Sequence, residues 1–284
     1  MGNEIALLGA TEIREIASRL ELRPAKSMGQ NFVIDGNSCQ KIVRVAGVTS
    51  DDLVLEIGPG LGSLSLAILQ AGAKLVAVEI DNRLANELAN TLRSHNCVAD
   101  TFTVINKDAL AVDELGEFPT KLVANLPYNI SVPVLLHILA KFPSITSGVV
   151  MVQTEVAERL AAKSGSKIYG IPSAKAAWWA DLTSAGTVSR SIFWPVPNVD
   201  SSLVRFVRHE SAGDEELRRA TFRIIDAAFA QRRKMLRSAL SSLYGSSAAA
   251  EAILIKAGID PILRGEALQV ESFCKIAAVA PDIF

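Results

Sequence analysis

The stretch Glu56-Ile57-Gly58-Pro59-Gly60-Leu61-Gly62 decides how this chain folds. It follows the apolar run 53–57, typical of a buried strand, and precedes residues 63–70, which have a helical pattern. Glycines in such a turn let the backbone approach a ligand without the clash of a Cβ atom. In open α/β sheets this turn lies beyond the carboxyl end of its strand, where ligands bind. A glycine cluster alone is also a common tight turn, so its surroundings must decide.

The surrounding residues repeat the same alternation of strand and helix. Further strands are expected at 74–80, 101–105, 121–124 and 148–153, and further helices at 83–93 and 132–141. This alternation predicts an α/β fold with a mostly parallel sheet covered by helices on both faces. Residues 180–208 read as antiparallel edge strands. Helices are expected at 215–229, 232–243, 248–257 and 271–278. We therefore place one domain at 1–210 and a helical C-terminal domain at 211–284.

Three acidic residues stand at the expected ends of three successive strands: Glu56, Glu79 and Asp108. The dinucleotide fingerprint would need glycine at position 63, which is serine. Glu56 would sit badly beside a pyrophosphate and suits the cationic methionyl end of S-adenosylmethionine. Glu79 can accept hydrogen bonds from both ribose hydroxyls, and Asp108 from the adenine amino group. The pattern predicts an S-adenosylmethionine site. Taken singly, Glu79 and Asp108 would also be consistent with acidic loop residues or helix caps.

The element Asn125-Leu126-Pro127-Tyr128 follows the fourth expected strand. The Asn125 side-chain oxygen and the Leu126 carbonyl can accept hydrogen bonds from an exocyclic amino group, and Pro127 stiffens the turn. Tyr128 can stack on a base and stabilise developing positive charge. We expect methylation of a base nitrogen, on a base that is flipped out or unpaired. Phe193, next to Pro195 and Pro197, is the candidate second wall, although such an aromatic often only packs in a core.

Composition narrows the class of protein. The chain has 284 residues, is 49% hydrophobic and carries a net charge of −1, so any nucleic-acid surface must be a local patch. Cys39, Cys97 and Cys274 are scattered, which argues against a disulfide framework or a zinc site. The start of the chain does not resemble a secretory signal, and no apolar run is long enough to span a bilayer. We expect a cytoplasmic protein that needs no membrane or metal and acts as a monomer.

These motifs together resemble those of the ribosomal RNA adenine dimethyltransferases, in particular the bacterial small-subunit type, over almost the whole chain. The matching segments are 27–33 (SMGQNFV), 56–62, 78–81 (VEID), 106–109 (NKDA), 125–131 (NLPYNIS), 152–153 (VQ) with 155–157 (EVA) and Arg159, and 193–201 (FWPVPNVDS). The resemblance implies that an N-terminal segment of about 50 residues closes over the cofactor through Gln30, Asn31 and Val33. It adds Ile80 and Ala109 to the cofactor site. It implies dimethylation of two adjacent adenosines in the 3′-terminal hairpin loop of 16S rRNA, during small-subunit assembly.

The chain departs from the family pattern at two places. Val33 stands where the family usually has leucine, and Ala25-Lys26-Ser27-Met28 replaces a more basic run. The 23S rRNA methyltransferases that confer macrolide resistance share the cofactor motifs, and a non-catalytic assembly factor could keep the same fold. The 125–131 and 193–201 segments, and 230–237 (AQRRKMLR), favour the small-subunit enzyme.

Two stretches are basic and are expected to contact rRNA within a pre-assembled 30S subunit. The residues concerned are Arg159, Lys163, Lys167 and Lys175 in the first, and Arg232, Arg233, Lys234 and Arg237 in the second. Arg233 and Arg237 would share one helix face at a spacing of four residues. Such side chains bind phosphates by charge and do not read sequence. A solvated helix face is the alternative interpretation.

Overall fold

The computed structural model describes residues 4–22 and 31–280. The chain forms two compact units: Met1–Ala157 with Thr183–Arg208, and Glu158–Leu182 with His209–Phe284. The predicted domains, 1–210 and 211–284, differ from this division because residues 158–182 group with the C-terminal helices. The reason is packing: Trp178 and Trp179 both meet the ring of Phe222 edge-on, at 6.2 and 5.5 Å between ring centroids.

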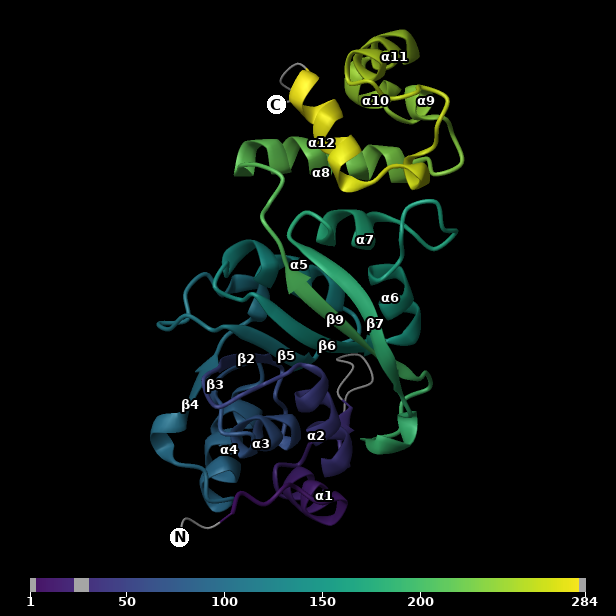
Figure 1. Ribbon diagram of the computed structural model, residues 1–284. Helices are drawn as coiled ribbons and strands as arrows, with labels where there is room; N and C mark the ends of the chain where they lie inside the picture. The colour runs from purple at the N-terminus through teal and green to yellow at the C-terminus, as the bar shows by residue number, and fades with distance from the viewer. Residues whose placement is uncertain (1–3, 23–30, 281–284) are drawn as a thin grey trace. The chain divides into compact units, whose positions relative to one another are not determined.

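The sheet has the order β4-β3-β2-β5-β6-β9-β7 within the described residues (Figure 1). Its parallel strands are β2 (Leu53–Ile57), β3 (Lys74–Glu79), β4 (Phe102–Asn106), β5 (Lys121–Asn125) and β6 (Ser147–Gln153). β9 (Ser201–Arg208) runs antiparallel to β6, and β7 (Ala180–Val188) lies beyond β9 at the edge. The chain crosses over between β4 and β5, from one edge to the other side of β2. This is the switch point where open α/β sheets bind ligands.

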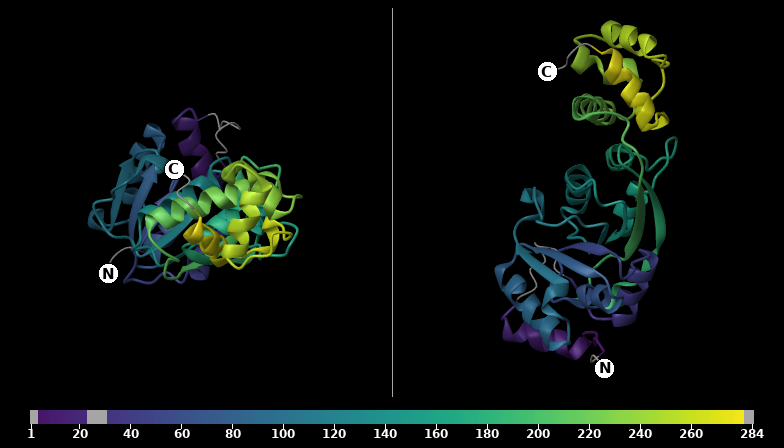
Figure 2. Two further views of the ribbon diagram at one scale, coloured as in Figure 1. Left: turned by 90° about the horizontal axis from the view of Figure 1, so that it is seen from above. Right: turned by 60° about the vertical axis from the view of Figure 1, so that its left-hand side comes forward.

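Helices cover both faces of the sheet because successive strand residues point to opposite sides. Val54 and Val123 share a core with the helices α1 (Ala10–Arg19), α2 (Gly36–Val45), α3 (Ser63–Gln70) and α4 (Asn82–Ser94). Their neighbours Leu55 and Leu122 are fully buried and face the other side, where α5 (Ser131–Lys141) lies (Figures 1 and 2). The α/β fold predicted from the sequence is therefore confirmed.

A separate two-stranded ribbon joins distant parts of the chain. β1 (Phe32–Val33) pairs antiparallel with β8 (Phe193–Trp194), with Phe32 opposite Trp194 and Val33 opposite Phe193. The Ile34 N–H donates to the Ile192 carbonyl at 2.7 Å and extends the pairing. The ribbon fixes the segment before α2 against the segment before β9. Short 3₁₀ turns lie at Ala99–Thr101, Ala109–Ala111, Arg190–Ile192 and Gly265–Ala267.

The second unit has a helical core of its own. Its helices are α7 (Ile171–Ala176), α8 (Glu215–Ala230), α9 (Leu236–Ala239), α10 (Ser241–Tyr244), α11 (Ser247–Lys256) and α12 (Val270–Val279). The division between the units falls within α6 (Thr154–Leu160), after Ala157. Ile224, Leu254 and Phe273 are fully buried in its centre. Among the described residues, no helix is both long and apolar enough to cross a membrane.

The expectation of one helix over 232–243 is wrong. The chain turns at 231–233, Met235 is extended, and the helix begins only at Leu236. The N–H groups of Leu236 and Arg237 donate to the carbonyls of Leu263 and Pro261, at 2.7 and 3.2 Å. These tertiary partners replace the helical ones, so Arg233 and Arg237 do not share a helix face.

Candidate active site

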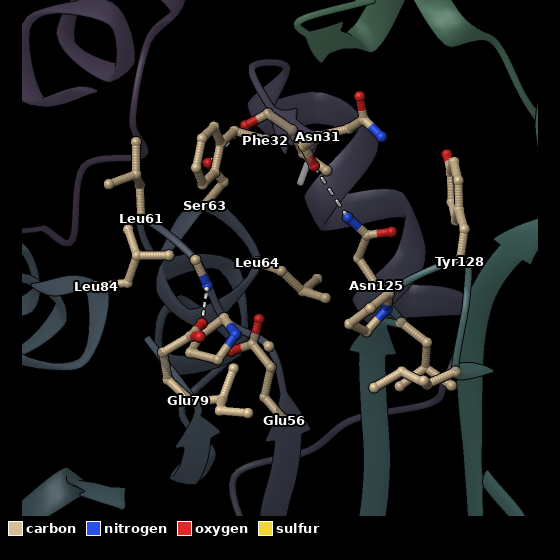
Figure 3. A pocket seen from close by; sticks show the side chains of 18 of the residues that line it. Asn31, Phe32, Glu56, Leu61, Ser63, Leu64, Glu79, Leu84, Asn125 and Tyr128 are labelled. Carbon is tan, nitrogen blue, oxygen red and sulfur yellow. Dashed lines mark hydrogen bonds between the residues drawn. The ribbon is translucent and has the colours of Figure 1, made fainter. Parts of the chain in front are cut away.

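A pocket opens where the carboxyl ends of β3, β2 and β5 meet (Figure 3). Glu79, Glu56 and Asn125 stand at the ends of these three neighbouring strands and enter the pocket side by side. The described residues that line it are Asn31, Phe32, Val33, Glu56, Gly58, Pro59, Gly60, Leu61, Ser63, Leu64, Glu79, Ile80, Leu84 and residues 125–130. The glycine turn and the Asn-Leu-Pro-Tyr element, almost seventy residues apart in sequence, thus belong to one site.

The glycine turn has a backbone that other residues rarely adopt. Gly58, Gly60 and Gly62 have φ angles of 68°, 58° and 99°. A Cβ atom on Gly60 would lie 3.1 Å from the Phe32 ring, and one on Gly62 would lie 2.8 Å from Leu88 Cδ1. Glycine is required here both for the left-handed conformation and for the close packing on each side.

The Glu79 carboxylate accepts hydrogen bonds from the backbone and can accept further ones. One carboxylate oxygen accepts from the Gly60 N–H at 3.2 Å, and the other accepts from the Asp81 N–H at 3.0 Å. Burial raises its pKa, and the two N–H groups act in the opposite direction. A carboxylate offers about four lone-pair sites, so two remain for a ligand. This fits the two hydroxyls of a ribose.

Glu56 is almost fully buried and accepts a 2.5 Å hydrogen bond from the Ser65 hydroxyl. Its pKa is raised from 4.5 to about 8, chiefly by burial; the Ser65 bond acts to lower the pKa, and the charge of Glu79 acts to raise it. Two buried carboxylates with raised pKa values make this end of the pocket favourable for a cation. The ammonium and sulfonium groups of S-adenosylmethionine carry positive charge of this kind. The glycine turn leaves space for the cofactor atoms that lie against the backbone.

The N-terminal side of the pocket is closed by the residues around β1. The Ser63 hydroxyl, at the start of α3, donates to the Val33 carbonyl at 2.6 Å. Asn31, Phe32 and Val33 all line the pocket, and the Phe32 ring packs over the glycine turn with Trp194 stacked 6.4 Å behind it. Gln30, which the family resemblance also assigned to the cofactor, lies outside the described residues.

Asn125 has an oriented amide. Its Nδ2 donates to the Asn31 carbonyl at 3.4 Å, and because a carbonyl only accepts, the nitrogen must face it (Figure 3). The oxygen therefore points to the side of Tyr128 (Figure 3). This Oδ1 atom is buried and has no hydrogen-bond partner among the described residues. An unpaired buried acceptor costs free energy, which a donor from a bound ligand would recover.

Leu126, Pro127 and Tyr128 form the wall beside Asn125. The Leu126 N–H donates to the Met151 carbonyl at 3.1 Å, and the Ile130 N–H to the Pro127 carbonyl at 3.2 Å. The first bond ties the turn to β6, and the second closes the turn itself. Tyr128 is half-buried, and its hydroxyl lies 2.8 Å from the Ser201 hydroxyl. One ring face is thus presented next to the Asn125 oxygen (Figure 3).

Asp108 and Ala109 are not among the described residues that line this pocket. Asp108 caps a 3₁₀ turn, because its Oδ1 accepts from the Leu110 N–H at 2.9 Å. The second carboxylate oxygen is left for another donor. Asn106, at the end of β4, instead ties the strand ends together by donating to the Glu79 and Ile80 carbonyls at 2.8 and 3.2 Å.

Phe193 does not lie where the sequence interpretation placed it. Its side chain is fully buried in the core, opposite Val33 in the ribbon, and it is not one of the described pocket residues. The ring belongs to the core cluster that also contains Phe32 and Val33. The structure therefore gives no support to Phe193 as the second wall of a base site.

The basic residues expected to meet RNA fall into two groups. Arg232 pairs with Glu266 at 2.9 Å and also donates to the carbonyls of Ser166 and Lys167, and Arg237 pairs with Glu251 at 3.2 Å. Lys175 pairs with Asp226 at 2.7 Å. These side chains hold the second unit together. Arg159, Lys163, Lys167, Arg233 and Lys234 are exposed.

Sequence reasoning missed several residues that line the pocket. Ser63, Leu64 and Leu84 carry no motif signal, because residues that line the wall of a pocket look like core or helix residues in sequence. Phe32 and Ile130 lie within the matching segments 27–33 and 125–131 but were given no role. Phe32 stands between Asn31 and Val33, both of which were assigned to the cofactor site.

Comparison with known proteins agrees with this geometry. Residues 22–282 match the family Ribosomal RNA adenine dimethylase. A Ribosomal RNA small subunit methyltransferase A from Leifsonia xyli subsp. xyli is 58% identical over 97% of this chain and 99% of its own length. The protein of the same description from Streptomyces griseus is 55% identical over 98% and 97%.

Solved structures share the fold at lower identity. A dimethyladenosine transferase from Plasmodium falciparum has a TM-score of 0.72 at 24% identity, covering 86% of this chain and 95% of its own. The 23S rRNA methyltransferase ErmE has a TM-score of 0.64 at 24% identity, covering 88% and 99%. With the family match over most of its length, the chain belongs to the ribosomal RNA adenine dimethylases, enzymes that use S-adenosylmethionine to dimethylate adenine in ribosomal RNA.

Proposed function

We propose that this enzyme dimethylates the exocyclic amino groups of two adjacent adenosines in the 3′-terminal hairpin loop of 16S rRNA, during small-subunit assembly. The observation that carries the chemistry is the buried Oδ1 of Asn125, which has no hydrogen-bond partner within residues 4–22 and 31–280 and whose orientation is set by the bond from Nδ2 to the Asn31 carbonyl. The target within the ribosome is supported by relatives of 50–58% identity that are named for the small subunit.

The proposed mechanism depends on hydrogen bonding to the target nitrogen. The lone pair of an adenine amino group is delocalised into the ring, which makes the nitrogen a poor nucleophile. Acceptance of its N–H groups by Asn125 Oδ1 and the Leu126 carbonyl favours a pyramidal nitrogen with a directed lone pair. When bound, S-adenosylmethionine supplies an electrophilic methyl group on a positively charged sulfur. The product aminium loses its proton to water, so the residues act by positioning and electrostatics.

We propose the following roles for the remaining site residues. Glu56 holds the methionyl ammonium, Glu79 the ribose hydroxyls, and the glycine turn the backbone-facing side of the cofactor. Asp108 uses its second oxygen for the adenine amino group, beside Ala109 and Ile80. Tyr128 stacks on the target base, which must leave any helix to reach it.

We further propose that the exposed cations Arg159, Lys163, Lys167, Arg233 and Lys234 contact rRNA phosphates within a pre-assembled 30S subunit. The internally paired Arg232 and Arg237 are assigned a structural role instead. The C-terminal helical unit is proposed as a contact region for rRNA. We propose that the enzyme acts in the cytoplasm, where its proposed 30S substrate is assembled, and as a monomer, since the described pocket residues all belong to one unit of the chain.

The test supplies S-adenosylmethionine with a labelled methyl group and three acceptors: 30S particles lacking the modification, 50S precursors and free 16S rRNA. The proposal expects dimethyladenosine at two adjacent positions of 16S rRNA, formed mainly in the 30S particles. Label confined to 23S rRNA would contradict this proposal and would identify the chain as a 23S rRNA methyltransferase of the type that confers macrolide resistance. Absence of label from all three acceptors, with cofactor binding intact, would favour a non-catalytic assembly factor.

A further inference from the structure

Ser201 makes a contact with the site that the sequence motifs did not predict. It is the first residue of β9, is fully buried, and lies 2.8 Å from the Tyr128 hydroxyl. We propose that Ser201 is a positioning residue that holds the Tyr128 ring at the angle required for stacking on the target base. This inference rests on the stacking role proposed for Tyr128.

The two partners differ in how firmly the backbone holds them. Ser201 is paired with Gln153 in the antiparallel β6–β9 ladder, and β9 is itself held between β6 and β7. One residue earlier, the Asp200 carbonyl accepts from both the N–H and the hydroxyl of Thr154, each at 3.1 Å. Tyr128 instead lies in the turn after β5. The hydrogen bond between the Ser201 hydroxyl, on the sheet, and the Tyr128 hydroxyl, at the tip of the ring, is therefore suited to restrain the tilt of the ring.

The chemistry of the contact fits a positioning role. Burial raises the pKa of Tyr128, with the Ser201 bond acting in the opposite direction, so the phenol stays neutral at physiological pH and keeps its hydrogen. Two hydroxyl groups can then share one hydrogen bond in either direction. Ser201 lies beyond the ring and is not one of the described pocket residues. It acts on the base only through Tyr128.

The neighbouring residue provides a matched control. The Ser202 hydroxyl is buried and lies 3.0 Å from the Thr154 hydroxyl. Ser202→Ala therefore removes a buried hydroxyl contact of the same kind, on the same strand, without touching Tyr128. Any effect of Ser201→Ala on methyl transfer that Ser202→Ala lacks must come through the ring.

The experiment measures single-turnover methyl transfer to 30S particles at saturating RNA and cofactor. Ser201→Ala is expected to lower the rate roughly 3- to 10-fold, the value of one hydrogen bond, with cofactor affinity unchanged. Tyr128→Phe should lower it similarly, and the double variant should be no slower than the slower single one. Ser201→Thr should restore most of the rate, and Ser202→Ala should match the wild type.

The outcomes separate this inference from the proposed function. A wild-type rate for Ser201→Ala, or full additivity with Tyr128→Phe, would overturn the positioning role while leaving the methylation reaction in place. Equal loss of rate in Ser201→Ala and Ser202→Ala would also overturn it, because the effect would then be structural. Failure of the wild-type enzyme to methylate 30S particles would instead count against the proposed function.

Discussion

Replacement of Glu56 by glutamine tests the electrostatics of the pocket. Burial raises the pKa of Glu56 from 4.5 to about 8. Ionising Glu56 therefore costs more free energy in the folded chain than in the unfolded chain. The stability that protonated Glu56 contributes is complete below about pH 4.5 and is lost as the pH rises through about 8. Glu56→Gln removes this loss and keeps an oxygen to accept the Ser65 hydroxyl.

The size of the effect follows from the pKa. At about 1.36 kcal/mol for each pKa unit, the rise to about 8 corresponds to a destabilisation of about 3 kcal/mol at pH 7 and about 5 kcal/mol at pH 9. These are upper values, since structural relaxation reduces the cost of a buried charge. The ligand-free Glu56→Gln variant should thus match the wild type near pH 4.5 and be increasingly more stable above it.

The assay is urea denaturation of the ligand-free enzyme between pH 5 and 9, with Glu114→Gln as a control at an exposed acid. Cofactor affinity, measured by calorimetry, should move in the opposite direction: Glu56→Gln should bind S-adenosylmethionine roughly tenfold or more weakly, because a charged hydrogen bond is lost. The reasoning is refuted if the wild type and Glu56→Gln show the same pH dependence of stability, or if the variant binds the cofactor as tightly.

Three further variants test the turn, the RNA surface and an internal ion pair. Gly60→Ala would place an alanine at a left-handed φ of 58°, with its Cβ atom 3.1 Å from the Phe32 ring. Because left-handed alanine costs about 1–2 kcal/mol, this variant should weaken cofactor binding about tenfold in calorimetry. Unchanged affinity would show that the turn needs no glycine there. Arg233→Ala with Lys234→Ala should weaken binding to 30S particles and reduce the salt slope by about 2. Arg232→Ala should instead lower thermal stability, through loss of Glu266. If the salt dependence of 30S binding is the same in the Arg233→Ala, Lys234→Ala variant as in the wild type, these two residues do not contact the RNA.

The parts of the fold that sequence could predict are those set by local periodicity. β2 and α3 match their expected bounds of 53–57 and 63–70, because a buried strand, a glycine turn and an apolar helix are all local signals. The convergence of Glu56, Glu79 and Asn125 followed from topology, since parallel strands end at one edge of the sheet.

The parts that could not be predicted depend on partners far away in sequence. Phe193 is turned into the core by pairing with β1, about 160 residues earlier, which no local pattern encodes. The helix expected from residue 232 is interrupted because the backbone at 236 and 237 bonds to residues 263 and 261. Ser201 belongs to the family-matching segment 193–201, but its contact with Tyr128, 73 residues earlier, is not encoded in that pattern.

The central claim is that the Asn125 side-chain oxygen accepts a hydrogen bond from the target amino group. The most direct measurement is single-turnover methyl transfer by Asn125→Ala to 30S particles, with cofactor affinity measured in parallel. The account predicts a rate at least about 100-fold lower, as for loss of an oriented electrostatic group, with cofactor affinity changed only slightly. Methyl transfer by Asn125→Ala at the wild-type rate would contradict it.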